Sequence, residues 1–190
     1  MGQGKFILIG DDKKILAGVK NTLVADGYLY IGYTNQTQSV LRTVRKTLPD
    51  LVVLEVQDRF YEQKEILEVI DDELLAPCVL VLKMRSDEVL QFVRQSKIMT
   101  YIMKPLYDEV LLQIADLSIS HFNRVVEYEH KLKKINENLA ARKVIEKAKW
   151  LIVEKRGMSE NEAYDFIRKK SRDNRLPMKE VAQAILLAES

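Results

Sequence analysis

The feature that most constrains the fold is an alternation of short apolar runs with helical patterns over residues 5–106. The apolar runs fall at residues 5–10, 28–34, 51–56, 78–84 and 100–103. Four of them are nearly continuous in apolar residues, as is typical of parallel strands that are covered on both faces. Amphipathic segments lie between them at residues 13–26, 36–48, 62–75 and 86–96. The alternation predicts an α/β fold with a five-stranded, doubly wound parallel sheet.

Functional side chains in such a sheet belong at the carboxyl ends of the strands. Asp11 and Asp12 follow the first predicted strand, and Glu55 ends the third. Lys104 ends the fifth, directly before Pro105. Because the ends of strands one, three and five lie near one another, we expect these charges to share a small pocket. Carboxylates at that density repel one another or bind a hard cation, which makes Asp11 and Asp12 possible Mg²⁺ ligands, although no cofactor is required.

The pocket residues carry a resemblance to response-regulator receiver domains over about residues 5–120. The segments FILIGDD, PDLVVLEV and YIMKP look like the corresponding receiver segments. In that family two acidic residues hold Mg²⁺, an Asp ending the third strand is phosphorylated, and Lys-Pro follows the fifth strand. The resemblance assigns Tyr101 to the aromatic position whose rotation reports phosphorylation.

Two departures indicate a degenerate receiver. The phosphoacceptor position is Glu55, and the additional methylene moves the carboxylate by about 1.5 Å, enough to spoil an in-line attack. Lys83 stands where the family has Ser or Thr, and either Lys83 or Lys104 could form a permanent ion pair with Glu55. We expect Glu55 to mimic a phosphorylated Asp, or the domain to be a scaffold that has lost its switch. Control by Asp phosphorylation is not expected.

The chain after Pro105 has a helical pattern. Residues 106–156 contain no Pro and no Gly, which predicts one long helix or two helices with a soft joint. Within it an apolar seam recurs at steps of three and four residues, at Val125, Tyr128, Leu132, Ile135 and Leu139. This seam of about two heptads predicts a coiled coil, and we expect a homodimer through residues 121–145. The alternative is that the seam packs against the body of its own chain.

The last 50 residues predict a small three-helix bundle. Gly157 ends one helix, the capping box SENE at residues 159–162 starts the next, and Pro177 starts a third. Residues 1–123 carry 14 Lys and Arg against 17 Asp and Glu, whereas residues 124–190 carry 16 against 11. A basic C-terminal third favours a polyanion as partner.

Residues 140–185 resemble the ANTAR domain, the RNA-binding module named after AmiR- and NasR-type transcription antitermination regulators. The resemblance rests on Arg142, Ile145, Ala148, Lys149, Gly157, Ser159, Glu162, Ala163, Arg168, Asn174, Val181 and Ala182. Trp150 departs from the family, which usually has Gly there, and we interpret it as a packing residue. Arg suits phosphate contact and stacking on unpaired bases. The candidate RNA-binding residues are Arg142, Lys149, Arg168, Arg172, Asn174 and Arg175.

These patterns divide the chain into a receiver-like domain, a coiled-coil linker helix and an ANTAR domain, at residues 1–120, 121–140 and 141–190. The resemblance implies a regulator, not an enzyme, that binds hairpins in nascent mRNA leaders as a dimer and prevents terminator formation. A regulatory protein is a further possible partner, and DNA is not expected. The alternatives are a DNA-binding response regulator with a helix-turn-helix output and a Mg²⁺-dependent phosphotransfer protein.

The sequence also suggests where the protein works. Its single cysteine, Cys78, lies in an apolar run, which indicates a reducing compartment. No signal peptide and no apolar run of about 18 residues is found, so no membrane span is indicated. We therefore expect a cytoplasmic protein.

Overall fold

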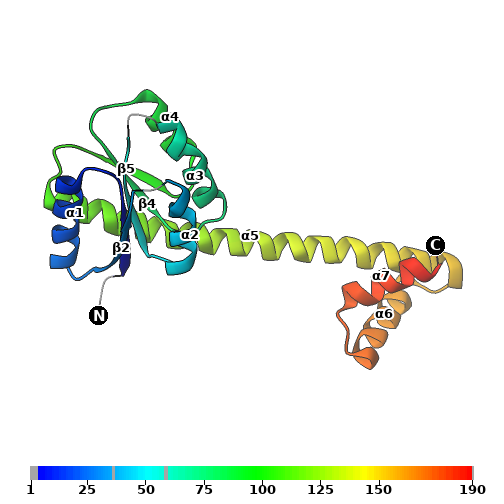
Figure 1. Ribbon diagram of the computed structural model, residues 1–190. Helices are drawn as coiled ribbons and strands as arrows, with labels where there is room; N and C mark the ends of the chain where they lie inside the picture. Colours follow the sequence, from blue (N-terminus) through cyan, green and yellow to red (C-terminus); the bar gives the residue numbers. More distant parts are fainter. Residues whose placement is uncertain (1–3, 36, 58–59, 190) are drawn as a thin grey trace. The chain divides into compact units, whose positions relative to one another are not determined.

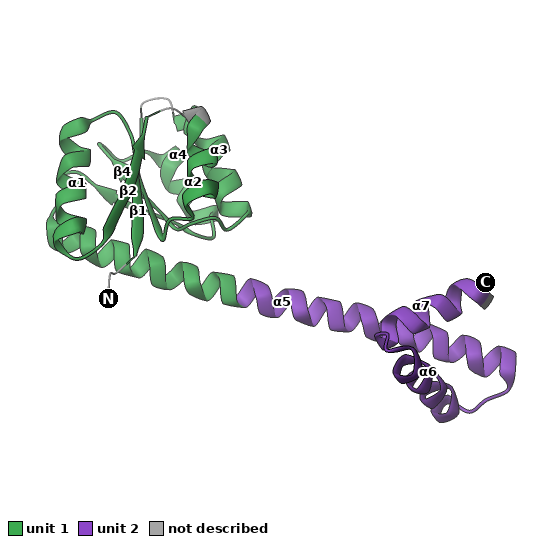
Figure 2. Cartoon of the chain, turned by 60° about the horizontal axis from the view of Figure 1, so that its bottom comes forward, with its two compact units in different colours: residues 1–127 green, residues 128–190 purple. Residues whose placement is uncertain are grey.

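The structure is a computed structural model that describes residues 4–35, 37–57 and 60–189. The chain forms two compact units, residues 1–127 and residues 128–190, which are distinguished by colour in Figure 2. The boundary between the units falls within one long helix, inside the segment 121–140 that the sequence analysis assigned to a linker. Residue 36, the first of the predicted helix 36–48, lies outside the described residues.

The first unit is built on five parallel strands in the order β2-β1-β3-β4-β5 (Figure 1). The strands are β1 (Lys5–Ile9), β2 (Leu29–Thr34), β3 (Leu51–Glu55), β4 (Cys78–Leu82) and β5 (Met99–Met103). Every residue of β3 and β4 is buried, which explains why these two strands are continuous apolar runs in the sequence. The predicted doubly wound parallel sheet is confirmed. Strand β4 ends at Leu82, so Lys83 lies in the loop that follows it.

Helices cover both faces of the sheet (Figure 1). One face packs against α1 (Lys13–Ala25) and the start of α5 (Asp108–Arg156). The other face packs against α2 (Thr37–Thr47), α3 (Phe60–Asp72) and α4 (Asp87–Gln95). Successive side chains of a strand point to opposite faces, and two apolar cores result. Phe6 and Leu8 belong to the core on the α1 side, whereas Ile7 and Ile9 belong to the core on the opposite side.

Helix α5 is a single helix of 49 residues, as one of the two sequence alternatives predicted. Its first part belongs to the α/β unit, where Phe122 and Val125 pack against the core beneath α2, α3 and α4. Val125, predicted to be the first residue of the seam, therefore contacts the body of its own domain. The remaining four seam residues are 52–59% exposed, namely Tyr128, Leu132, Ile135 and Leu139.

The second unit is a bundle of the C-terminal part of α5 with α6 (Glu160–Asn174) and α7 (Met178–Glu189). Its core places Ala148, Ala163 and Ala182 at full burial, so that the three helices approach closely. The predicted capping box is present: the Ser159 hydroxyl accepts the Glu162 N–H, and the Glu162 carboxylate accepts the Ser159 N–H. Across the part of the chain that the structure describes, no helix combines the length and the apolar character needed to cross a membrane.

Candidate functional site

Glu55 lies at the carboxyl end of β3 and is 3% exposed. Both of its carboxylate oxygens accept hydrogen bonds from protein groups. Its Oε2 accepts the backbone N–H groups of Asp12 at 2.8 Å and of Asp11 at 3.2 Å. Its Oε1 accepts the Lys104 ammonium at 2.9 Å. The ends of β1, β3 and β5 therefore meet at one carboxylate, as the sequence predicted.

Lys104, and not Lys83, is the cation that pairs with Glu55. The Lys104 side chain is 18% exposed and reaches Glu55 across the end of β4. Lys83 is exposed and lines a pocket of about 320 Å³ together with Asp11, Asp12 and Glu55. Within the described residues, no carboxylate lies within ion-pair distance of the Lys83 ammonium. The structure thus decides between the two pairings that the sequence left open.

The pKa of Glu55 reflects this environment. Burial alone would raise the pKa of the carboxyl group. The Asp12 N–H, the Lys104 ammonium and the Asp11 N–H outweigh burial and hold the pKa below its ordinary value. Glu55 is therefore a carboxylate at neutral pH, and the Glu55–Lys104 contact is a charged ion pair.

Gly10 makes room for the Glu55 side chain. The backbone of Gly10 has a φ of +154°, and a Cβ at this position would lie 2.7 Å from the Glu55 Cβ and 2.9 Å from its Oε2. Only glycine permits this approach without displacement of the neighbouring side chain. Gly10 therefore allows the Glu55 carboxylate to lie close enough to accept the Asp11 and Asp12 backbone N–H groups.

The two acidic residues after β1 are also engaged by protein donors. Asp12 is the N-cap of α1, and its Oδ1 accepts the N–H groups of Lys14 and Ile15 at 3.1 and 3.2 Å. The Asp11 Oδ2 accepts the side-chain amide of Gln57 at 2.5 Å. Gln57 was not singled out from the sequence, because its role depends on a contact between residues 46 positions apart.

These contacts bear on the Mg²⁺ site that the receiver resemblance implies. A magnesium ion needs oxygen ligands whose lone pairs point at the metal. Here both Glu55 oxygens and one oxygen each of Asp11 and Asp12 accept hydrogen bonds from N–H or ammonium donors. Among the described residues, no group of three or more acidic, His or Cys side chains is placed to hold a metal ion. Glu55 is thus engaged through both of its oxygens, whereas Asp11 and Asp12 each have a second carboxylate oxygen outside these hydrogen bonds.

Tyr101, the predicted switch aromatic, lies on β5 opposite Leu80 and is 40% exposed. The pocket that contains Glu55 is lined by residues of β3, of α3 and of the loops after β1, β3 and β4, and Tyr101 is not among them. Its ring faces solvent in this structure. The sequence placed Tyr101 correctly on the fifth strand, three residues before Lys104.

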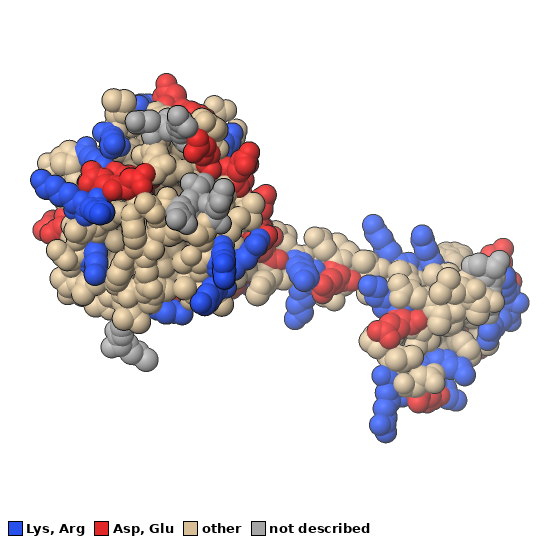
Figure 3. Space-filling model, viewed as in Figure 1, with Lys and Arg blue, Asp and Glu red and all other residues tan. Residues whose placement is uncertain are grey.

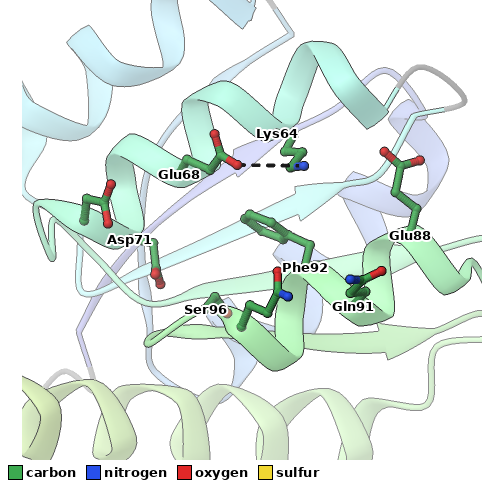
Figure 4. Close-up of a pocket in the computed structure, with 9 residues that line it drawn as sticks. Lys64, Glu68, Asp71, Glu88, Gln91, Phe92 and Ser96 are labelled. Atoms are coloured by element: carbon green, nitrogen blue, oxygen red, sulfur yellow. Dashed lines mark ion pairs between the residues drawn. The ribbon is translucent and has the colours of Figure 1, made fainter.

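A larger pocket of about 410 Å³ lies between α3 and α4, away from the predicted site (Figure 4). Lys64 and Glu68 face one another along its α3 side, with 3.9 Å between their charged atoms. Asp71, at its end, is 8% exposed and accepts the backbone N–H groups of Lys97 and Ile98 at 2.9–3.0 Å. Asp71 therefore ties α3 to the turn before β5, which is a structural role.

Unit 2 carries the predicted RNA-binding residues, and Figure 3 shows Lys and Arg side chains outnumbering Asp and Glu on its visible face. Tyr164, Arg168 and Arg172 recur every four residues along α6 and so share one face of the helix. All three are exposed, and Arg168 pairs with Asp165 at 2.9 Å. Arg175 follows as the C-cap in the left-handed conformation, with φ at 54°. We call Tyr164, Arg168, Arg172 and Arg175 the α6 basic face.

The other three predicted RNA-binding residues, Arg142, Lys149 and Asn174, differ in whether their side chains are free to contact RNA. Arg142 is exposed on α5. The Lys149 side chain is only 13% exposed, and its ammonium lies 3.0 Å from Glu146 and 3.5 Å from Glu160, so it ties α5 to the start of α6. The Asn174 amide donates to the Lys170 carbonyl at 2.9 Å. Lys149 and Asn174 therefore make structural contacts within the bundle.

Trp150 corrects another expectation. The sequence analysis interpreted it as a packing residue, but its side chain is 61% exposed. The neighbouring positions Ala148 and Ile152, each two residues away, are fully buried in the bundle core. A displacement of two residues turns a helical side chain by about 200°, so Trp150 faces away from that core.

Comparison with known proteins agrees with the geometry of both units. Residues 133–186 match the family model described as the ANTAR domain. The transcriptional regulatory protein PdtaR of Mycobacterium tuberculosis is 26% identical over 181 residues, which cover 95% of this chain and 88% of PdtaR.

Two solved structures show the fold of the α/β unit. The receiver domain of a modulated diguanylate cyclase from Desulfovibrio desulfuricans G20 has a TM-score of 0.56 at 15% identity, covering 63% of this chain and 96% of its own. A CheY-like receiver domain protein from Methanospirillum hungatei JF-1 has a TM-score of 0.55 at 20% identity, with the same coverage of each chain. The α/β unit therefore has the fold of a receiver domain, and residues 133–186 of the C-terminal part match the ANTAR domain.

Proposed function

We propose that this protein is an RNA-binding transcription antiterminator, without enzymatic activity, that engages hairpins in nascent mRNA leaders and prevents terminator formation. The observation that carries the proposal is the α6 basic face, which lies within the ANTAR-matched residues. Arginine forks bind phosphate bidentately and stack on unpaired bases, which are the accessible elements of a hairpin loop. Such a role requires a cytoplasmic location, where transcripts are made.

We further propose that the protein acts as a homodimer through the exposed seam of α5, defined by Tyr128, Leu132, Ile135 and Leu139. All four side chains lie on one face of the helix at heptad spacing and are at least 52% exposed. Four exposed apolar side chains in register favour pairing with an identical helix. Two ANTAR domains in one dimer would bind two adjacent hairpins, and tethering raises the effective concentration of the second binding event.

The test of RNA binding is a charge reversal on the α6 basic face. We expect Arg168→Glu/Arg172→Glu to weaken binding of a selected RNA stem-loop by roughly 100-fold, because two phosphate or base contacts become repulsive. Affinity is measured by fluorescence anisotropy, and terminator read-through by transcription in vitro. The matched control is Arg42→Glu/Lys46→Glu, the same charge change at the same spacing on exposed positions of α2.

Three outcomes of this test are decisive. Loss of hairpin binding in the α6 variant alone supports the proposal. Equal losses of RNA affinity in both variants would mean that net charge, and not the α6 basic face, determines binding. Tighter binding of duplex DNA than of stem-loop RNA would replace the proposal with a DNA-binding output.

The receiver-fold domain is proposed to work without phosphorylation of Glu55. The Glu55–Lys104 pair occupies the donors that would receive a phosphoryl group, and Lys83 replaces a small hydroxyl. We expect acetyl phosphate with Mg²⁺ to leave the wild-type chain unlabelled on a phosphate-affinity gel, and Glu55→Asp/Lys83→Thr to become labelled. Labelling of the wild type would contradict the proposal, and labelling of Glu55→Asp alone would show that Lys83 is no barrier.

A further inference from the structure

We propose that Trp150 is a platform on which an unpaired base of the bound RNA stacks, flanked by Lys143 and Lys147 as phosphate contacts. This inference rests on the RNA-binding function proposed above and adds a second contact surface, on α5, to the α6 basic face. Trp150 is the single tryptophan of the chain. Its side chain is 61% exposed on a helix and does not belong to the core of the bundle, so an aromatic ring of this size is available to a binding partner.

The surroundings of Trp150 favour a polyanion as the occupant. Lys147 precedes it by three residues and Lys143 by seven, which puts all three on one face of α5. Both lysines are exposed, and neither ammonium has an acidic partner among the described residues. The carboxylate of Glu146, on the same side, is engaged by Lys149 at 3.0 Å, and the exposed Glu154 bounds the lysine-rich stretch one turn beyond Trp150.

An aromatic ring beside free cations suits single-stranded RNA. A base offers a π-face to the indole, and its backbone offers phosphates to the ammonium groups. A second copy of the chain fits the same face less well. Two parallel helices paired here would bring Lys143 and Lys147 close to the same lysines of the other copy, and like charges in contact are destabilising. The apolar part of the seam also ends at Leu139, eleven residues before Trp150.

The experiment uses the full chain and its own tryptophan as the reporter. Stem-loops are first selected on the wild-type protein from a pool with a randomised single-stranded loop. A selected stem-loop is then titrated into the protein while the anisotropy of the labelled RNA and the intrinsic tryptophan fluorescence are recorded together. Stacking is expected to quench the indole and to protect it from acrylamide in parallel with the anisotropy change.

Substitutions separate stacking from general packing. We expect Trp150→Ala to weaken binding roughly tenfold, and Trp150→Phe, which keeps an aromatic face, to recover most of the affinity. The matched control is Leu187→Ala, which truncates an 83% exposed apolar side chain of the same unit and should leave affinity unchanged. Lys147→Gln should lower the slope of affinity against salt by about 0.7, as expected for one single-strand phosphate contact.

The outcomes distinguish this inference from the function on which it depends. The stacking proposal would be overturned if the RNA binds tightly while the indole stays unquenched and accessible to acrylamide, and if Trp150→Ala binds with wild-type affinity. The RNA-binding function would then still hold. Failure to enrich any stem-loop would overturn both. If the indole is protected from acrylamide in the free protein and this protection is lost on dilution, Trp150 lies in an interface with a second copy of the chain, and the stacking proposal is wrong.

Discussion

Replacing Leu132 and Ile135 by lysine is expected to convert the proposed dimer into monomers. Each of these side chains is 54% exposed in the single chain, so the change should leave the bundle and the α/β unit folded. Burial of a Leu or Ile side chain contributes about 1.5–3 kcal/mol, and each substitution removes two such side chains from a symmetric interface. Sedimentation velocity over a range of protein concentrations measures the result.

The loss of the dimer should also change RNA recognition in a characteristic way. Binding to an RNA with two adjacent hairpins should weaken by about 10²–10⁴-fold, because the second contact is no longer tethered. Binding to one hairpin should stay within about twofold of wild type, since the α6 basic face is untouched.

Controls for this prediction come from the same unit. Leu176→Lys/Leu187→Lys adds the same charge at exposed positions outside α5 and should leave the sedimentation of the protein unchanged. A dimer that persists in the Leu132/Ile135 variant would move the interface to another surface. A wild-type chain that stays monomeric at every concentration would leave the seam without its proposed role.

Removal of the Lys104 ammonium is expected to destabilise the α/β unit by about 2–3 kcal/mol at pH 7. Lys104→Met keeps most of the side-chain volume but leaves the Glu55 carboxylate, only 3% exposed, without its cation. The matched control is Arg45→Met, which breaks an ion pair with Glu73 whose side chains are about half exposed, and which should cost less than about 1 kcal/mol. Urea unfolding followed by circular dichroism gives both values.

The pH dependence of this effect has a defined sign. The folded-state pKa of Glu55 lies below the ordinary value of 4.5, so the wild-type pair stabilises the fold above that pH and loses its contribution as pH falls. Without Lys104, the pKa of Glu55 should lie above its value in the wild type, because burial still raises it and only the Asp12 and Asp11 N–H groups still lower it. The Glu55 carboxylate of the variant is then protonated at a higher pH than that of the wild type, which removes its unpaired charge. The difference in unfolding free energy between wild type and Lys104→Met should therefore shrink between pH 7 and about pH 4.

A double substitution completes the test. Glu55→Gln/Lys104→Met removes both charges and should be more stable at pH 7 than Lys104→Met alone, because no buried charge is left unpaired. A single-variant loss that is independent of pH would mean that packing, and not the ion pair, is responsible.

Much of the architecture was accessible from the sequence because the signals are local. The continuous apolar runs at residues 51–56 and 78–84 reflect strands buried on both faces, and the apolar pattern is a property of each run by itself. The capping box at Ser159 and the absence of Pro and Gly within α5 likewise act within a few residues. The position of Glu55, Asp11, Asp12 and Lys104 at one edge follows from the parallel α/β topology that these patterns predict, because the carboxyl ends of parallel strands lie at the same edge.

The partners of individual side chains could not be obtained in this way. Whether Glu55 pairs with Lys83 or Lys104 depends on where the loop after β4 places Lys83, which is exposed, and on the reach of Lys104 from the end of β5. The engagement of Asp11 by Gln57 depends on a loop that brings distant residues within hydrogen-bond distance. Lys149 has the charge of an RNA ligand, but the start of α6 places Glu160 beside it.

The sequence by itself therefore determined the sheet, the long helix, the bundle and the set of residues at the pocket, because periodicity and capping are read over a few neighbouring positions. Tertiary structure alone decided that Glu55 is held by Lys104, that Val125 leaves the seam to pack on the core, and that Trp150 faces solvent. These outcomes depend on which surfaces meet in space. A displacement of about two residues in a helix, or of one residue in a strand, moves a side chain to the opposite face without changing the local pattern.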